Sequence, residues 1–207
     1  MQSAESPLRR PKPEEDEPRN HHVCPWWVGY LLASPLRKWR EKPNTILAPW
    51  VEPKMTVLDI GCAMGFFSLP AARLAGPEGR VVCVDVQQRM LNSLDRRARR
   101  KGFAKVIETR LCSQRDLGLG DLAGTADLAL AIHVVHETAF PVLWFEQVWA
   151  ALRPGGRLVV AEPSGHVSQA DFEDEKSIAR TCGFDVGLND SFSKGWAMTC
   201  VKPAETL

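Results

Sequence analysis

Two acidic residues stand at the ends of apolar segments, where side chains can bind a nucleotide-like ligand. Asp59 lies in the segment 57–60, directly before Gly61, and Asp85 ends the segment 81–85. A strand, a glycine-containing turn and a helix start together present backbone N–H groups to such a ligand. An acidic residue at the tip of the next strand accepts hydrogen bonds from both hydroxyls of a ribose. The pair predicts a site for a ribose-containing cofactor.

The turn after the first segment has the spacing Gly61-x-Ala63-x-Gly65. A pyrophosphate site uses Gly-x-Gly-x-x-Gly, in which the glycines let the backbone approach two phosphates. Asp59 beside the turn would repel a phosphate and would attract a cationic amino-acid group. The pattern therefore disfavours a dinucleotide, and an NAD(P)-dependent oxidoreductase is the weaker alternative.

The turn resembles motif I of the class I S-adenosylmethionine (SAM) methyltransferases, although Ala63 stands where that family usually has glycine. Residues 152–163 also resemble the family's helix end, Pro-Gly-Gly turn and fifth strand, and the resemblance extends over roughly residues 45–202. It implies SAM as cofactor, S-adenosylhomocysteine as product, and methyl transfer to a small-molecule acceptor by in-line displacement. A SAM-binding protein without methyltransferase activity, or one that uses SAM for another reaction, is the alternative.

The resemblance also implies which residues bind the cofactor. Asp59 and Gly61 would contact the methionine part and Asp85 the ribose, while Val86 and Met90 would flank the adenine, with Gln87 beside them. The predicted cofactor-binding residues are Asp59, Gly61, Cys62, Ala63, Gly65, Asp85, Val86, Met90, Cys112, Ser113, Gln114 and His133. Many family members place an aspartate that bonds the adenine amine where this chain has Ser113.

Two histidines follow the predicted fourth strand and are the candidate catalytic residues. His133 ends the strand, and His136 follows three positions later. A neutral histidine can accept a proton from a hydroxyl, thiol or amine, or it can bond a backbone carbonyl and only shape the pocket. Methyl transfer from a sulfonium mainly requires alignment, so a base is needed only when the acceptor must lose a proton. The acceptor atom stays open.

An aromatic N-terminal segment is the candidate substrate pocket. Trp26, Trp27 and Tyr30 could line that pocket or only cover the edge of the sheet, and His166, after the fifth strand, could reach the same place. The histidines and Cys24 do not match the carboxylate and asparagine ligands of metal-dependent family members, so no metal is predicted. The sequence lacks the Asp/Asn-Pro-Pro-Tyr pattern of members that methylate exocyclic base nitrogens or glutamine side chains.

Composition sets the remaining expectations. The chain has 207 residues, is 44% hydrophobic, and has a net charge of +1, which gives no global reason to expect nucleic acid or a membrane surface as partner. The cationic run 96–101 suits the dipole at a helix C-terminus, with a nucleic-acid patch as the alternative. Six scattered cysteines, no secretory segment and no membrane-spanning run predict a cytoplasmic protein with reduced thiols. The oligomeric state is left open.

The chain divides into three predicted parts. Residues 1–22 are rich in proline and charge and are expected to be a disordered tail, 23–50 a helical cap, and 51–207 the SAM-binding domain. The predicted fold is α/β, a Rossmann-like doubly wound sheet of seven strands in the order 3-2-1-4-5-7-6, with the seventh strand antiparallel. Helices are expected at 45–50, 66–74, 88–102 and 140–152, and from a capping box at Ser168 to about Thr181.

Overall fold

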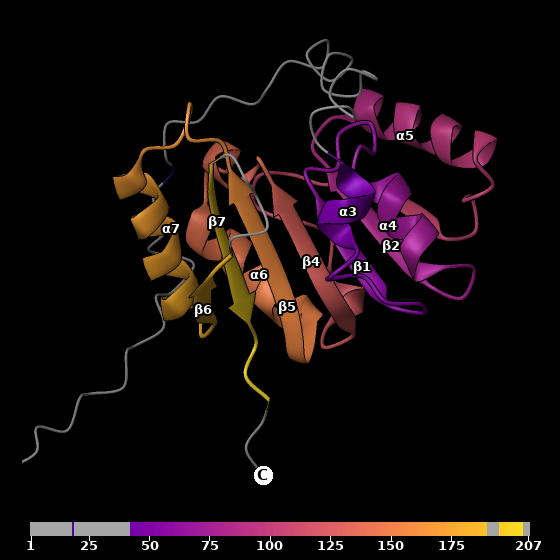
Figure 1. Cartoon of the computed structure of the whole chain (residues 1–207). Helices are drawn as coiled ribbons and strands as arrows, with labels where there is room; N and C mark the ends of the chain where they lie inside the picture. Colours follow the sequence, from indigo (N-terminus) through magenta and orange to yellow (C-terminus); the bar gives the residue numbers. More distant parts are fainter. Residues whose placement is uncertain (1–17, 19–41, 190–194, 205–207) are drawn as a thin grey trace, which may run out of the picture.

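The computed structural model describes residues 18, 42–189 and 195–204, and its centre is a seven-stranded sheet (Figure 1). The strands in chain order are β1 (Thr56–Ile60), β2 (Arg80–Asp85), β3 (Ile107–Leu111), β4 (Ala126–Ile132), β5 (Leu152–Glu162), β6 (Asp185–Leu188) and β7 (Trp196–Val201). Their spatial order is β3-β2-β1-β4-β5-β7-β6, and β7 runs antiparallel to both of its neighbours. The predicted Rossmann-like fold is confirmed.

Helices cover both faces of the sheet because its central strands are apolar on both sides. Within the described residues the helices are α3 (Pro43–Leu47), α4 (Ser68–Ala75), α5 (Gln88–Arg100), α6 (Pro141–Ala151) and α7 (Gln169–Thr181), with 3₁₀ turns η2 (Gly120–Leu122) and η3 (Val135–Glu137). Val57, Val81 and Leu128 belong to the buried cluster that includes α3, α4 and α5. Their neighbours Leu58, Val82 and Ala129 belong to the cluster that includes α6 and α7. Side chains therefore alternate between the two layers along each strand.

The strands β2 and β3 lie on one side of β1, whereas β4 and all later strands lie on the other side. The order of the strands therefore reverses between β1 and β4, which pair in parallel. Ligands of open α/β sheets bind outside the carboxyl ends of the strands at such a switch point. The carboxyl ends of β1, β2 and β4 place Asp59, Asp85 and His133 at this edge. The topology therefore brings together residues that are far apart in the sequence.

Helix boundaries follow local signals closely in most places. The capping box at Ser168 is present, because its side chain accepts from the Asp171 backbone N–H while the Asp171 carboxylate accepts from the Ser168 N–H. In α5, Leu91, Leu94 and Ala98 are buried on one face, as predicted. The first core helix starts at Ser68 rather than at residue 66, because residues 66 and 67 still belong to the turn after β1.

The Pro-Gly-Gly segment differs from the prediction, since it lies within β5 instead of preceding the strand. Ala126 pairs with Leu152 and Leu128 pairs with Arg157, so the residues between them bulge out of the ladder. A Cβ at Gly156 would lie 2.8 Å from the Arg153 carbonyl oxygen, which explains the need for glycine. Pairing with the backbone of Lys202 holds the bulge in the sheet.

Lys202, directly after β7, is a buried lysine whose side chain caps the C-terminal end of α6. Its Nζ donates hydrogen bonds to the carbonyl oxygens of Trp149 at 2.9 Å and Leu152 at 2.7 Å, and it lies 3.9 Å from the centre of the Trp149 ring. The last carbonyls of a helix lack partners within the helix and carry its negative dipole end. Lys202 therefore supplies both hydrogen bonds and charge where α6 needs them.

The variant Lys202→Met is expected to lower the free energy of unfolding by about 2–4 kcal/mol, because two carbonyl groups lose a charged donor inside the protein. Urea denaturation followed by circular dichroism would measure the change. Lys105→Met, at an exposed position, is the matched control and should change stability by less than about 0.5 kcal/mol. Equal stability of the two variants would contradict this role of Lys202.

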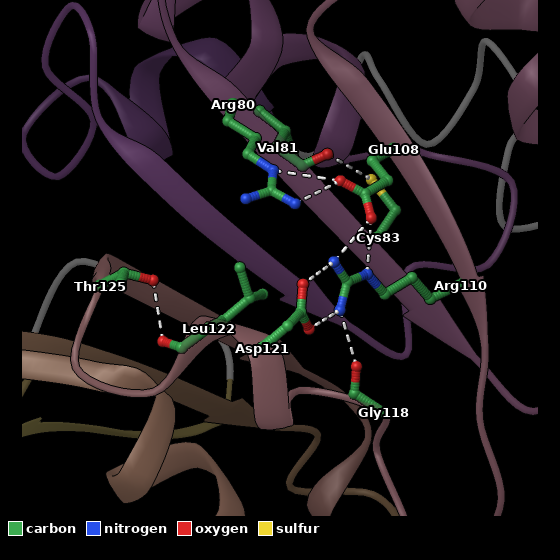
Figure 2. A network of polar contacts seen from close by, with 9 residues as sticks. All are labelled: Arg80, Val81, Cys83, Glu108, Arg110, Gly118, Asp121, Leu122 and Thr125. Atoms are coloured by element: carbon green, nitrogen blue, oxygen red, sulfur yellow. Dashed lines mark hydrogen bonds and ion pairs between the residues drawn. The ribbon is translucent and has the colours of Figure 1, made fainter.

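An ion-pair network holds the edge strand β3 to the loop around η2 (Figure 2). The Arg110 guanidinium donates to Glu108 at 2.7 Å, to Asp121 at 2.9 Å and to the Gly118 carbonyl at 2.7 Å, and Arg80 on β2 also donates to Glu108. Partial burial acts to raise the pKa of Glu108, but the hydrogen bonds from Arg80 and Arg110 leave it below its usual value. The network fixes the loop against the outermost strand.

No helix in the described part of the chain is long and apolar enough to cross a membrane. The predicted tail, apart from residue 18, and most of the predicted helical cap lie outside the described residues. Of the cap, the structure describes residues 42–50, where the short helix α3 begins at Pro43, two residues before its predicted start. Pro43 suits that position because the first N–H of a helix needs no partner within the helix.

Candidate functional site

A cleft opens at the carboxyl ends of the parallel strands, with about 1050 Å³ of empty space including its open mouth. Eleven of the twelve predicted cofactor-binding residues line it: Asp59, Gly61, Cys62, Ala63, Asp85, Val86, Met90, Cys112, Ser113, Gln114 and His133. Gln87 lines it as well, whereas Gly65 lies on the other side of the turn and lines a second cavity. The structure therefore gathers the tips of four strands around one space.

Asp85, at the tip of β2, is buried and links the turn after β1 to the start of α5. Its Oδ2 accepts a hydrogen bond from the Ala63 N–H at 2.9 Å, and its Oδ1 accepts one from the Gln87 N–H at 2.8 Å. Burial raises the pKa of Asp85, while these two hydrogen bonds act to lower it. A carboxylate oxygen has more than one lone pair, so Asp85 can accept further hydrogen bonds from a ligand in the cleft.

Asp59 lies in β1 and is even more deeply buried, with 3% of its surface exposed. The Ser68 hydroxyl, in the first turn of α4, donates a hydrogen bond to its Oδ2. Burial raises the pKa of Asp59 to about 6, the Ser68 hydrogen bond opposes this rise, and the nearby Asp85 charge adds to it. A buried carboxylate with this pKa is a suitable partner for a ligand cation, which would stabilise its ionised form.

The turn between β1 and α4 uses left-handed backbone at three alternate residues. Gly61 has φ +72°, Ala63 +47° and Gly65 +80°. The N–H groups of Gly61 and Cys62 donate to the Val84 carbonyl, which ties the turn to β2. Alanine rarely adopts positive φ because its Cβ approaches the backbone carbonyl, so Ala63 is strained by roughly 1 kcal/mol.

The variant Ala63→Gly is expected to raise the free energy of unfolding by up to about 1 kcal/mol, because glycine removes this strain. It should also strengthen the binding of SAM predicted for this cleft, since it removes a methyl group from the lining. Chemical denaturation and calorimetric titration would measure the two changes. Ala150→Gly, at an exposed position of α6, should instead lower stability by about 1 kcal/mol. A loss of stability in Ala63→Gly as large as in this control would contradict the argument.

The loop after β3 brings three predicted residues to the cleft wall. The Ser113 hydroxyl accepts hydrogen bonds from the N–H groups of Arg115 and Asp116, so it shapes its own loop. The Gln114 side-chain carbonyl accepts from the Ala139 N–H at 3.1 Å. Burial raises the pKa of the Cys112 thiol to about 12, so this group is a neutral part of the wall. Ser113 thus shapes its own loop at the position where many family members have an aspartate.

His133 lines the cleft directly after β4 and has a left-handed backbone with φ +61°. Its N–H donates to the Ala161 carbonyl at 2.7 Å, which anchors this conformation to β5. Histidine is one of the few non-glycine residues enriched at positive φ, and such backbone is often found at functional sites. The fold therefore holds His133 in an unusual backbone conformation in the wall of the cleft.

His136 lies outside the cleft lining, in η3, and pairs with a buried glutamate. Its Nδ1 bonds to Oε2 of Glu162, at the end of β5, and Oε1 of Glu162 accepts from the Val135 N–H at 2.8 Å. Burial acts to lower the pKa of His136, but Glu162 and then Glu137 leave it above its usual value. The predicted pocket residue His166 packs edge-on against the His136 ring and does not line the cleft.

Several residues of the site were not predicted. Glu162 ends an apolar strand as Asp59 and Asp85 do, so the same signal could have identified it. The unpredicted lining is mainly apolar: Ile60, Phe66, Phe67, Leu117, Ile132, Val134, Glu137, Thr138 and Trp144. Trp26, Trp27 and Tyr30 lie outside the described residues. In the part of the chain that the structure describes, no three His, Cys, Asp or Glu side chains are grouped to hold a metal ion.

Residues 51–196 match the family described as the methyltransferase domain. A protein of Streptomyces fradiae, named an uncharacterised protein in transposon Tn4556, is 32% identical over 122 residues, which are 59% of this chain and 34% of that protein. The arsenite methyltransferase of Halobacterium salinarum is 31% identical over 123 residues, 59% of this chain and 30% of the relative. The matched regions span about a third of these two relatives.

Solved structures share the fold at low sequence identity. A SAM-dependent methyltransferase from Aquifex aeolicus superposes with a TM-score of 0.77 at 20% identity, covering 87% of this chain and all of the other. At this identity the similarity shows a shared fold.

Proposed function

Because this chain belongs to the methyltransferase-domain family of class I SAM-dependent enzymes, SAM is its cofactor, and we propose that it transfers the methyl group of SAM to a small-molecule acceptor. The observation that carries the proposal is the pair of buried carboxylates, Asp59 and Asp85, in one cleft at the switch point of the sheet. Asp85 suits two ribose hydroxyls and Asp59 suits an ammonium group, so the donor set fits an amino-acid nucleoside.

The chain's own residues would hold SAM in three places. Asp85 would accept from the ribose hydroxyls, Asp59 would pair with the ammonium group of the methionine part, and Val86 and Met90 would flank the adenine. When bound, SAM supplies an electrophilic methyl carbon on a sulfonium sulfur. The apolar side chains Phe66 and Trp144 in the lining would exclude water from this carbon.

A small, partly apolar acceptor is the best match to the lining. Phe67, Leu117 and Ile132 add apolar surface to the cleft, and the described part of the lining lacks lysine and arginine. Such a wall favours uncharged or weakly polar ligands over a nucleic-acid phosphate. The halobacterial relative is named for arsenite, which is also a small molecule.

We assign the two histidines different roles. His133 lines the cleft and is the candidate to contact the acceptor and, in its neutral form, to take its proton. His136 is a positioning residue, because Glu162 holds its ring and the same glutamate accepts from the Val135 N–H in η3. Glu137, at the end of η3, lines the cleft and would be set in place by this pairing.

Methyl transfer can be tested with SAM labelled in the methyl group and a panel of acceptors bearing hydroxyl, amine, thiol or arsenite groups. We expect a methylated product and S-adenosylhomocysteine in equal amounts. In His133→Ala we expect kcat to fall at least tenfold with the affinity for SAM nearly unchanged. Lys105→Ala, at an exposed position that does not line the cleft, is the control and should leave kcat within about twofold.

A SAM-binding protein without methyl transfer is the second candidate. It is favoured by strained Ala63 in the cofactor turn and by Ser113, whose hydroxyl bonds its own loop. Tight SAM binding with no turnover on any acceptor of the panel would support this candidate over the first.

A further inference from the structure

A second cavity lies on the opposite side of the turn 61–65, between α3, α4 and α5. It has about 900 Å³ of empty space including its open mouth, which is similar to the cleft. Gly65 and Phe66 form its wall toward the turn, and Figure 1 shows the three helices grouped on one side of the sheet. This space is separate from the carboxylates Asp59 and Asp85, which do not line it.

The second cavity is strongly cationic. Lys42, Arg73, Arg97 and Lys101 all line it, and the described lining includes no acidic residue. Among the described residues, none of these four cations forms an ion pair. Four like charges around one space repel each other, and an anion bound between them would remove that repulsion.

Arg97 is half-buried in this cavity and has unused hydrogen-bonding capacity. Its Nη1 donates to the carbonyl oxygen of Met64 in the turn. A guanidinium group has five N–H donors in a planar arrangement that matches two oxygens of a phosphate. Burial lowers the pKa of Arg97, and none of the described carboxylates lines the cavity or pairs with this guanidinium group.

The rest of the lining is mostly apolar. Phe66, Leu69 and Phe103 contribute side chains, with Pro43 and Pro70 beside them, and Asn44 and Thr45 add uncharged polar groups. A ligand that satisfies both parts of the wall needs an anionic group and an apolar or aromatic body.

We propose that this cavity binds a small molecule that bears a phosphate or diphosphate group on an apolar or aromatic body. The arginine and lysine side chains supply charge-assisted hydrogen bonds to the phosphate oxygens, and the phenylalanine and leucine side chains contact the body. The cationic run 96–101 therefore does more than complement the helix dipole, because two of its members line a cavity. The proposal does not depend on methyl transfer.

Calorimetric titration with inorganic pyrophosphate and with uridine diphosphate would test this proposal. S-adenosylhomocysteine is added at saturation so that the cleft is occupied, and the titration is repeated with the double variant Arg73→Gln/Lys101→Gln. Arg97 stays unchanged because it also bonds the Met64 carbonyl in the turn. The matched control is Arg96→Gln/Arg100→Gln, which removes the same charge from exposed positions of α5 that do not line the cavity.

We expect one molecule of either probe to bind per chain, with uridine diphosphate tighter than pyrophosphate. The cavity variant should weaken binding at least tenfold, since each lost charged hydrogen bond accounts for roughly a factor of ten, and the control by less than about threefold. If thermal melting shows that the double variant unfolds, Lys42→Gln provides the same test at an exposed position.

Three results would overturn the proposal. The first is no saturable binding of either probe at millimolar concentration. The second is an equal loss of binding in the cavity variant and the control, which indicates general attraction to a basic surface. The third is tight binding of a short single-stranded RNA that both variants weaken equally and that pyrophosphate does not displace, which indicates a nucleic-acid surface.

Discussion

Replacing Asp85 with alanine is expected to weaken SAM binding at least about 100-fold. In the proposed function this carboxylate accepts hydrogen bonds from both ribose hydroxyls, and two charge-assisted hydrogen bonds account for roughly 3 kcal/mol or more. The variant also leaves the N–H groups of Ala63 and Gln87 without their acceptor, so the turn and the start of α5 lose their link.

Calorimetric titration with SAM, S-adenosylhomocysteine and NADH would measure this effect. Asp95→Ala, at a partly exposed position of α5, removes the same charge and should leave the affinity within about twofold. Asp85→Asn removes the charge but keeps the shape of the side chain, because the amide keeps one acceptor oxygen. Unchanged SAM affinity in Asp85→Ala would show that the ribose binds elsewhere. Binding of NADH but of neither sulfur ligand to the unaltered protein would overturn the methyltransferase proposal.

Replacing Asp59 with asparagine is expected to stabilise the protein without ligand and to weaken its SAM binding. In the folded protein burial raises the pKa of Asp59 from 3.8 to about 6, so the ionised carboxylate destabilises the fold by roughly 3 kcal/mol. Asparagine has no charge to desolvate and can still accept the Ser68 hydrogen bond. It cannot pair with the ammonium group of SAM.

The protonation of Asp59 makes the free energy of unfolding depend on pH. Because the folded state holds the Asp59 proton more tightly than the unfolded state, stability due to this group falls as pH rises from about 4 to 6. Above pH 6 the cost is fully present, so the gain in Asp59→Asn should be largest there and should vanish near pH 4. SAM needs the ionised form, so its affinity should fall roughly tenfold between pH 7 and pH 5.

Denaturant titrations at several pH values and calorimetry at pH 7 and pH 5 would measure both effects. Asp95→Asn is the control and should follow the unaltered protein. Burial also raises the pKa of Asp85, so protonation of Asp85 contributes to the loss of SAM affinity at low pH. The part of this loss that is absent in Asp59→Asn is due to Asp59. If Asp59→Asn has the same stability as the unaltered protein above pH 6, the ionised Asp59 carboxylate does not destabilise the fold.

The placement of Asp59 and Asp85 at one edge of the sheet was predictable because its signals are local. Asp59 and Asp85 each end an apolar segment next to a turn, and parallel pairing of β1 and β2 places them at one edge. The Ser68 hydrogen bond to Asp59 was not predictable, since it depends on where α4 starts after the turn. The pairing of His136 with Glu162 likewise depends on contact between η3 and the end of β5, which lie 26 positions apart.

Local signals gave a wrong result where long-range pairing decides the structure. Pro154, Gly155 and Gly156 indicate a turn before a strand, yet they lie inside β5 as a bulge. The reason is Lys202, whose backbone pairs with Gly155 and Gly156 across the sheet from 46 or more positions away. The second cavity was equally hidden, because Lys42, Arg73 and Lys101 come from three separate segments.

The position of β7 between β5 and β6 affects how the protein is assembled. Residues 185–188 leave the ribosome before 196–201, yet among the described strands β6 pairs with β7 alone. Until β7 is inserted, the long edge of β5 is open to pairing with another chain. A nascent chain stopped before Trp196 should therefore have all the strands whose carboxyl ends form the cleft but an unpaired edge on β5, so we expect it to aggregate until β7 is added.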